Sequence, residues 1–304
     1  MTGPRRGAVR PSSRTAPAIT VGGVRTRVLE TDGSGPVVLL VHGYSDSADG
    51  WRDVMDRLAT DGVRSVAVDL PHHGRAGRPP VTSFLSVLDD FLAAAVQEFD
   101  RGDGVVLVGN SVGGLSALRV AQRADLPLRA VIAIGPAGLS APLWMKLVRR
   151  SRPVSTRIVE TIGVPIIRGT NVVPALLGAG FARAVAGGKL SPTARAQYAS
   201  HWGPGDLRRQ LLLGGRTIEE LVSPDVLGSK PFQVPVTVAW GSRDWITPSR
   251  GARAFGRSHP EIVTRVLPGT GHCPQYDRPD LVTDLIVDVH RAAARHHETQ
   301  GETP

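Results

Sequence analysis

The stretch that most constrains the fold of this chain is a short apolar run that ends in a glycine-rich turn. Residues 105–108 are all Val or Leu, which indicates a buried strand, and a helical pattern follows at 115–124. Gly-Asn-Ser-Val-Gly lies between them at 109–113. So short a turn strains the backbone of Ser111 and leaves its side chain exposed at the end of the strand. Gly109 and Gly113 are needed because a Cβ there would collide with neighbouring backbone.

Strand and helix patterns alternate on both sides of this turn. Alternation of this kind implies β-α-β crossovers and a mostly parallel sheet flanked by helices, so the sequence predicts an α/β fold. Strands are predicted at 19–21, 24–30, 37–41, 64–70, 105–108, 129–134, 234–240 and 261–267, and helices at 51–58, 82–99, 115–124, 248–257 and 279–294.

The alternation stops between residues 138 and 230. This segment contains helical patterns interrupted by Gly and Pro, at 141–150, 155–162, 175–186, 192–202 and 206–213. We interpret 138–230 as an α-helical cap, or lid, inserted into a core formed by 18–137 and 231–295. Residues 1–17 are rich in Arg, Pro, Ser and Thr and are predicted to be a disordered basic tail. The polar residues 296–304 are predicted to be a frayed tail.

A serine hydroxyl needs a general base to act as a nucleophile, and His272 is the best candidate. It lies in the glycine-rich loop that follows the strand at 261–267, and open α/β sheets place their active sites at such strand ends. His42 follows an earlier strand, where a structural role within its loop is favoured. Surface roles are favoured for His290, His296 and His297, which lie on the terminal helix or tail. For His201, in the predicted cap, a pocket-lining role and a surface role are equally open. The remaining histidines follow strands or lie in loops: His72, His73 and His259.

The base in turn needs a carboxylate that orients it and stabilises its protonated form. Asp244 is predicted for this role because it follows the strand at 234–240. Asp69 and Asp277 are rivals, but we expect Asp69 to stabilise its own loop, and Asp277 is close to His272 in sequence. Thr247 is expected to cap the next helix.

An oxyanion formed by attack on an acyl group needs two N–H donors. The N–H that follows the nucleophile belongs to Val112. The second donor is predicted to be the N–H of Tyr44, because Gly43 before it allows close approach of the backbone.

These motifs resemble those of the α/β-hydrolase superfamily, in its serine-nucleophile branch with a helical cap. The resemblance implies an α/β-hydrolase fold without cofactor or metal, with Ser111 as nucleophile, Asp244 as acid, His272 as base, and Tyr44 and Val112 as oxyanion donors. It covers residues 19–295 and rests on HGY at 42–44, DLPHHG at 69–74, GNSVGG at 109–114, GSRDWITP at 241–248 and GTGHCPQYDRP at 269–279.

The chemistry that this resemblance favours is hydrolysis of a carboxylic ester or related acyl compound through a Ser111 acyl-enzyme. Serine at the nucleophile position argues against haloalkane dehalogenases and epoxide hydrolases, which use Asp. Asn110 is similar to the residue before the nucleophile in carbon–carbon bond hydrolases of aromatic degradation, although their glycine-rich loop after the first His-Gly is missing. A cofactor-free haloperoxidase or perhydrolase and a non-catalytic ligand receptor are further alternatives.

Composition limits the partners and the compartment. The net charge is +9, and residues 138–230 alone carry a balance of +8. We interpret this as a solvated Arg-rich surface that would tolerate an anionic acyl substrate, and we expect no nucleic-acid partner. The run LWMKLVRR at 143–150 resembles an interfacial membrane helix, but a helix packed over the active site is favoured. A single cysteine, Cys273, and no apolar signal segment are typical of a cytoplasmic protein.

Overall fold

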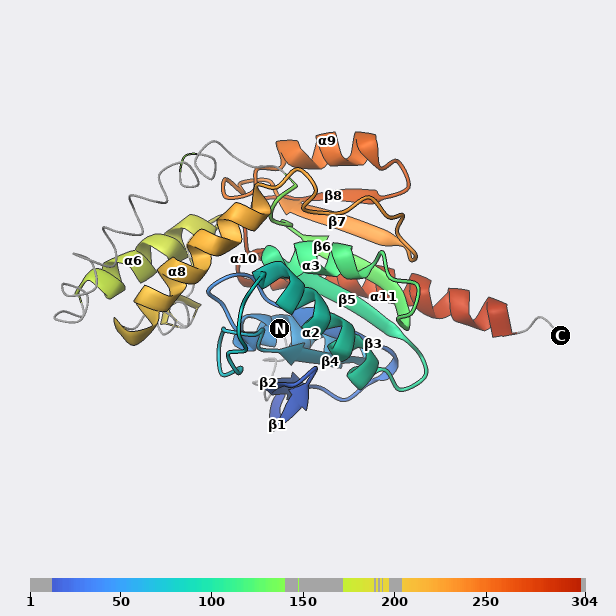
Figure 1. The fold of residues 1–304 in the computed structure, drawn as a ribbon. Helices are drawn as coiled ribbons and strands as arrows, with labels where there is room; N and C mark the ends of the chain where they lie inside the picture. The colour runs from blue at the N-terminus through green and yellow to red at the C-terminus, as the bar shows by residue number, and fades with distance from the viewer. Residues whose placement is uncertain are drawn as a thin grey trace, which may run out of the picture.

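The computed structural model describes residues 13–139, 147, 172–188, 190, 192, 194–196 and 204–301. Its centre is an eight-stranded sheet in the order β1-β2-β4-β3-β5-β6-β7-β8 (Figure 1). Strands β1 and β2 pair antiparallel, β2 pairs antiparallel with β4, and all further pairs are parallel. The predicted mostly parallel sheet is therefore confirmed. The strands are β1 (Arg14–Val21), β2 (Val24–Glu30), β3 (Ser34–Val41), β4 (Val63–Val68), β5 (Val105–Asn110), β6 (Leu128–Ile134), β7 (Val236–Gly241) and β8 (Val263–Leu267).

The central strands are buried on both faces, which explains their continuous apolar runs. In β3, Leu39 and Val41 belong to one core and Val38 and Leu40 to the other, because successive side chains point to opposite faces. The first core is closed by α2 (Phe84–Phe99), α3 (Val112–Val120) and α9 (Arg250–Ser258). The second is closed by η1 (Ala48–Trp51), α1 (Arg52–Thr60) and α11 (Pro279–Gly301).

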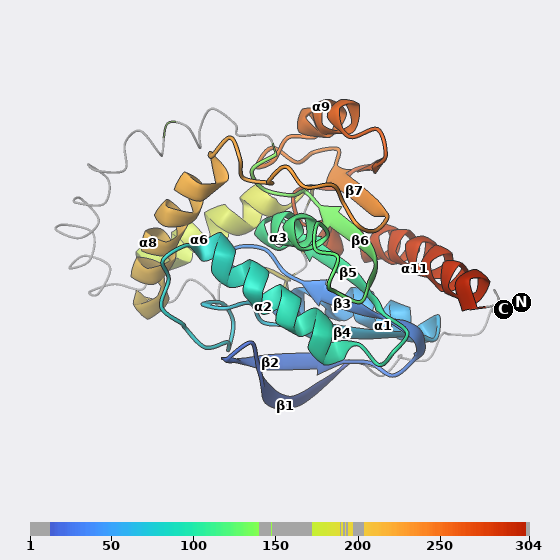
Figure 2. The same cartoon turned by 45° about the vertical axis from the view of Figure 1, so that its right-hand side comes forward.

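Two helices of the segment 138–230 lie side by side at the carboxyl ends of the central strands (Figures 1 and 2). They are α6 (Val172–Val185) and α8 (Pro204–Leu221). The carboxylate of Glu220 on α8 accepts hydrogen bonds from the Ser83 hydroxyl at 2.8 Å and from the Phe84 N–H at 2.8 Å. Since these groups form the N-terminus of α2, α8 is anchored to the core by a helix cap.

The helix at 204–221 is longer than the sequence indicated. The predicted end at residue 213 was based on Gly214 and Gly215, which commonly stop a helix. In the structure Gly214 serves close packing instead, because a Cβ there would lie 2.9 Å from the Tyr44 hydroxyl oxygen. The helices predicted at 141–150 and 155–162 lie outside the described residues apart from Leu147, as does most of 192–202.

Both predicted tails are wrong in part. Strand β1 already begins at Arg14, whose guanidinium forms ion pairs with Glu30 and with Asp32 at 2.9 Å. The sequence 14–17 therefore belongs to the sheet, whereas residues 1–12 lie outside the described part. At the other end, α11 continues to Gly301 because residues 292–298 are mostly good helix formers without a breaker.

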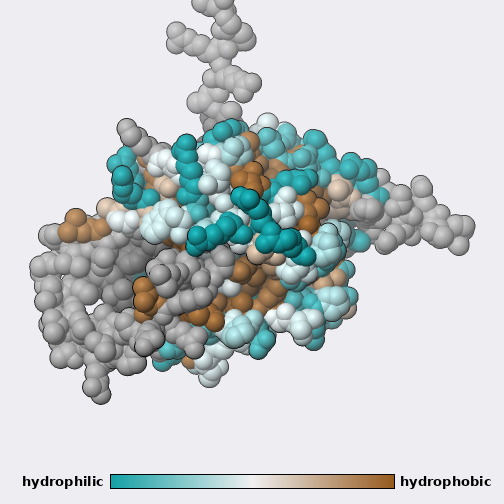
Figure 3. Space-filling view, turned by 90° about the horizontal axis from the view of Figure 1, so that it is seen from above, coloured by the Kyte–Doolittle hydropathy of each residue, from teal (hydrophilic) through white to brown (hydrophobic). Residues whose placement is uncertain are grey.

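The far edge of the sheet is formed by β8, which pairs only with β7. Val263 and Val266 are exposed there, and apolar and polar side chains are mixed on the face seen from the side of α9 and β8 (Figure 3). Among the described helices, none is both long and apolar enough to cross a membrane.

Candidate active site

Ser111 sits at the sharp turn between β5 and α3, as the sequence predicted. Its φ of 56° and ψ of −117° are rarely adopted by residues other than glycine. The strained turn is held by the Ser111 N–H, which donates to the Ile134 carbonyl at 2.9 Å, and by the Ser111 carbonyl, which accepts from the Ala137 N–H at 3.1 Å. A Cβ on Gly113 would lie 2.5 Å from the His42 carbonyl oxygen, so this position admits only glycine.

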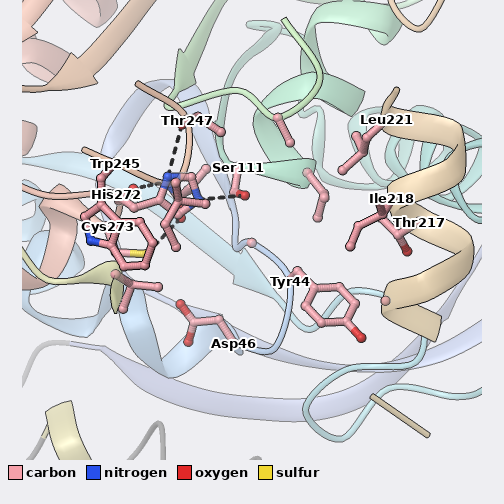
Figure 4. Close-up of a pocket in the computed structure, with 17 residues that line it drawn as sticks. Tyr44, Asp46, Ser111, Thr217, Ile218, Leu221, Trp245, Thr247, His272 and Cys273 are labelled. Carbon is pink, nitrogen blue, oxygen red and sulfur yellow. Dashed lines mark hydrogen bonds between the residues drawn. The ribbon is translucent and has the colours of Figure 1, made fainter. Parts of the chain in front are cut away.

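A hydrogen-bonded chain joins Ser111, His272 and Asp244 (Figure 4). Nε2 of His272 lies 2.8 Å from the Ser111 Oγ, and Nδ1 lies 2.9 Å from the Asp244 Oδ2. All three residues are buried: Ser111 is 8% exposed, His272 4% and Asp244 6%. The structure thus brings the three predicted side chains together from three separate strand ends.

Thr247 belongs to this chain of hydrogen bonds rather than to a helix cap. Its hydroxyl donates to the Asp244 Oδ2 at 2.7 Å and lies 3.1 Å from the His272 Nδ1. The predicted cap is wrong because α9 begins at Arg250, with Ser249 before it. The Asp244 Oδ1 accepts the N–H groups of Ile246 and Thr247, each at 2.9 Å, so both carboxylate oxygens are held in place.

Asn110 fixes the loop that carries the histidine. Its side-chain N–H₂ donates to the His272 carbonyl at 2.9 Å and to the Ile134 carbonyl at 3.1 Å. Its Oδ1 accepts from the Cys273 thiol at 3.4 Å and from the Gln275 amide at 3.3 Å. Because Asn110 is fully buried, this saturated network ties the nucleophile turn to the histidine loop.

The two rival carboxylates have other partners. Asp277 accepts the N–H groups of Gly187 at 2.8 Å and Gly271 at 2.7 Å, so it joins the end of α6 to the histidine loop. Asp69 accepts hydrogen bonds from Nε and Nη2 of Arg27, at 2.9 and 3.0 Å, and from the Ala48 N–H at 2.8 Å. Asp69 therefore stabilises the loops around it, as we expected.

The two residues predicted to supply the oxyanion donors, Tyr44 and Val112, lie beside Ser111. Tyr44 and Val112 both line the cavity that contains Ser111, and a Cβ on Gly43 would lie 2.9 Å from the Ser111 Cβ. Val112 is the first residue of α3, and the first N–H groups of a helix have no acceptor within it. The His42 ring accepts the Leu70 N–H at Nε2, 2.9 Å away, and contacts the Gly43 carbonyl at 2.7 Å.

Ser111 opens into a cavity of about 350 Å³. The cavity lies between the turn and α8, from which Thr217, Ile218 and Leu221 point inward (Figure 4). The wall on the side of α9 is formed by Trp245 and Ile246. Apolar side chains dominate the lining, and no Lys or Arg belongs to it in the described part of the chain. Sequence reasoning did not identify these wall residues.

Asp46 is a second titratable group of this cavity that sequence reasoning missed. Its side chain is 2% exposed, and burial raises its pKa to about 7. Its Oδ1 accepts from the Tyr276 hydroxyl and the Ser47 N–H, both at 2.8 Å, and these bonds oppose the shift. Its Oδ2 has no hydrogen-bond partner among the described residues. The signal in the sequence was its position four residues after His42, in the loop that follows β3.

No group of three His, Cys, Asp or Glu side chains could hold a metal ion within the residues that the structure describes. The polar groups around Ser111 are engaged with one another, in the pattern of a nucleophile, a base and an acid. The chemistry available to this arrangement is nucleophilic attack by a serine hydroxyl.

The fold and this serine turn define the chain as an α/β hydrolase. A model of the alpha/beta hydrolase family matches residues 38–285, and the chain belongs to this family. It is 24% identical over 302 residues to an uncharacterized protein of Mycobacterium tuberculosis, covering 93% of this chain and 84% of the relative. It is 27% identical over 297 residues to a 2-hydroxy-6-oxo-6-(2'-aminophenyl)hexa-2,4-dienoic acid hydrolase of Metapseudomonas resinovorans, covering 91% and 93%. The solved structure of a thermophilic esterase from Thermogutta terrifontis matches with a TM-score of 0.61 at 20% identity, covering 93% and 99%.

Proposed function

We propose that the protein hydrolyses carboxylic esters with apolar acyl groups through a Ser111 acyl-enzyme. The observation that carries this proposal is the Ser111–His272–Asp244 chain, whose two hydrogen bonds measure 2.8 and 2.9 Å, at the wall of an apolar cavity. A hydroxyl, an imidazole and a buried carboxylate in this order are the groups that acyl transfer needs.

In the first step the Ser111 Oγ attacks the ester carbonyl while the His272 Nε2 accepts its proton. Asp244 stabilises the imidazolium through Nδ1–H, and the Thr247 hydroxyl helps to hold that carboxylate. The N–H groups of Tyr44 and Val112 bind the developing oxyanion. His272 then returns the proton to the departing alcohol, and water hydrolyses the acyl-enzyme by the same route.

The cavity favours an uncharged acyl group. A charged carboxylate in an apolar cavity is unfavourable without a cation to pair it, and the described lining contains no Lys or Arg. A volume of about 350 Å³ is at the lower end for ligand sites and suits a short to medium acyl chain.

Carbon–carbon bond hydrolysis is the second candidate. The Metapseudomonas relative is named for that activity on a dienoic acid, and Asn110 is similar to the residue that precedes the nucleophile in such enzymes. Its substrate is an anion, for which the described cavity wall offers no partner. The ester is therefore the better match.

A substrate panel of neutral p-nitrophenyl esters and an anionic dienoic acid tests the proposal. We expect turnover of the esters, its loss in Ser111→Ala, and full activity in Ser86→Ala, a matched change on the exposed face of α2. A fluorophosphonate probe should label the native chain once and the Ser111→Ala variant not at all. Faster turnover of the dienoic acid would favour the second candidate. Absence of labelling and of any turnover in the folded native protein would favour a ligand receptor.

A further inference from the structure

A second cavity lies at the other end of the sheet from Ser111. Its volume is about 220 Å³. It is enclosed by the loop between β2 and β3, the loop between α2 and β5, and the first residues of β4, which lie together in both ribbon views (Figures 1 and 2). The lining residues are Gly33, Ser34, Gly35, Val37, Arg64, Arg101, Asp103 and Gly104. This composition, small residues around two arginines, differs from that of the apolar cavity at Ser111.

Arg64 is a buried cation whose donors are mostly unused. It is 8% exposed, and its Nη1 donates one hydrogen bond of 3.3 Å to the Phe99 carbonyl. Its other guanidinium N–H groups have no hydrogen-bond partner, and no carboxylate pairs with it, within the described part of the chain. Burial lowers the pKa of Arg64, and the positive charge of Arg101 lowers it further.

The acidic groups nearby do not neutralise this cavity. Glu30 and Asp32 attract Arg64, but both already form ion pairs with Arg14, at 3.2 and 2.9 Å. Asp103 lines the cavity and is exposed, and among the described residues it forms no ion pair with either arginine. Arg64 and Arg101 thus line one small cavity with a single carboxylate, and the acidic groups that attract Arg64 are shared with Arg14.

We propose that this cavity binds a phosphate group, either free phosphate or the end of a small phosphomonoester. The planar fork of N–H donors on each guanidinium matches the oxygens of a tetrahedral oxyanion, which can accept from Arg64 and Arg101 together. The anion would replace the repulsion between the two arginines by attraction to both. Gly33 and Gly104 line the cavity and let the chain pack closely there, because a Cβ would lie 2.1 Å from the Arg64 backbone N and 2.6 Å from the Arg129 side chain. The site is separate from the proposed ester hydrolysis at Ser111.

Isothermal titration of the full chain with inorganic phosphate, at constant ionic strength, tests the proposal. We expect one phosphate per chain, and at least a tenfold loss of affinity in both Arg64→Gln and Arg101→Gln. Arg257→Gln on α9 removes the same charge from an exposed position away from this cavity and should bind as the native chain does. The Ser111→Ala variant should also bind phosphate normally, which distinguishes this site from the cavity at Ser111.

Arg101→Gln makes the test robust, because Arg101 is exposed and its replacement should leave folding intact. Phosphate should raise the unfolding temperature of the native chain but not that of Arg101→Gln. Methyl phosphate in place of phosphate asks whether a phosphomonoester enters the cavity, and acetate asks whether a planar carboxylate suffices. Native binding in Arg101→Gln, no binding in the native chain, or equal affinity for acetate would each overturn the proposal.

Discussion

The Ser111–His272–Asp244 chain and the wall of the cavity beside it are built in different ways. The three residues are held at their backbone or by backbone groups: Ser111 by a strained turn, His272 by the Asn110 side-chain amide on its carbonyl, and Asp244 by two backbone N–H groups. The wall on α8 consists of side chains such as Ile218 and Leu221, which fill space without hydrogen bonds of their own. For the proposed ester hydrolysis, this contrast predicts that the rate of the chemical step depends on hydrogen-bond geometry at Ser111, whereas substrate choice depends on the apolar side chains of the wall.

Asp244→Asn should have the largest effect on activity. The amide cannot stabilise the imidazolium and favours the wrong tautomer of His272, so we expect kcat on a p-nitrophenyl ester to fall about 10⁴-fold. Asp277→Asn changes a neighbouring, partly buried carboxylate that accepts the backbone N–H groups of Gly187 and Gly271. Steady-state kinetics should show less than a tenfold loss for it. Similar losses in both variants would contradict the role proposed for Asp244.

Asp46 is a polar group in the cavity wall, and its raised pKa predicts a pH-dependent stability. Because its folded pKa of about 7 lies above the unfolded value of 3.8, the folded state holds the proton more tightly. Its contribution to stability is therefore complete below pH 3.8 and is lost as the pH rises through about 7. We expect Asp46→Asn to gain stability relative to the native chain between pH 4 and 8, by up to about 4 kcal/mol. Urea unfolding at a series of pH values measures this difference.

Asp49→Asn provides a control of opposite sign. Burial raises the pKa of Asp49, but its ion pairs with Arg27 and Arg52 outweigh burial and lower the pKa overall. Its contribution is present above the unfolded pKa and is lost as the pH falls through the folded value. The stability advantage of the native chain over Asp49→Asn should therefore shrink in acid. Parallel pH profiles for Asp46→Asn and Asp49→Asn would show that Asp46 is not the titrating group.

Much of the fold and of the Ser111–His272–Asp244 arrangement could be predicted from the sequence, because strands and tight turns leave local signals. Apolar runs mark the strands, and Gly109 and Gly113 mark the turn at Ser111. The motifs around Ser111, Asp244 and His272 predicted that these three residues act together. In the structure, hydrogen bonds of 2.8 and 2.9 Å join them. Thr247 was misassigned because a Thr before a Pro is a helix-cap signal, and only the fold shows its hydroxyl beside Asp244.

The wall of the cavity could not be predicted because it depends on contacts between segments that are distant in the sequence. Ile218 and Leu221 have the pattern of any amphipathic helix, and which face meets the cavity is decided by the anchor of Glu220 on α2. The position of Asp46 after His42 does not reveal its raised pKa, which arises from burial in a fold where its hydrogen-bond partner Tyr276 is 230 residues away. Pairing over such a separation has no local trace in a single sequence.

Asn110→Ala should weaken the support of the His272 loop without removing Ser111, His272 or Asp244. Loss of the two N–H donors leaves the carbonyls of His272 and Ile134 without this partner, and the histidine loop is free to shift. A small misplacement of the base is expected to lower kcat about 10²-fold, with KM nearly unchanged. The rate of fluorophosphonate labelling at Ser111 should fall in parallel, which a purely structural role would not cause. Gln275→Leu, which removes only one donor to the Asn110 Oδ1, should have a smaller effect.

Ile218→Phe should have the smallest effect on activity, and this effect should be specific to the cavity wall. The larger side chain shortens the cavity of about 350 Å³ from the side of α8. We expect kcat/KM for a long acyl ester to fall about tenfold, while the acetyl ester keeps its native value, because a hydrophobic wall discriminates by about 1–3 kcal/mol. Leu176→Phe, at a position on α6 that is 68% exposed, is the matched control and should leave both esters unaffected. An equal loss for acetyl and long acyl esters in Ile218→Phe would mean that α8 supports the reacting groups themselves, and the division between chemistry and substrate choice would fail.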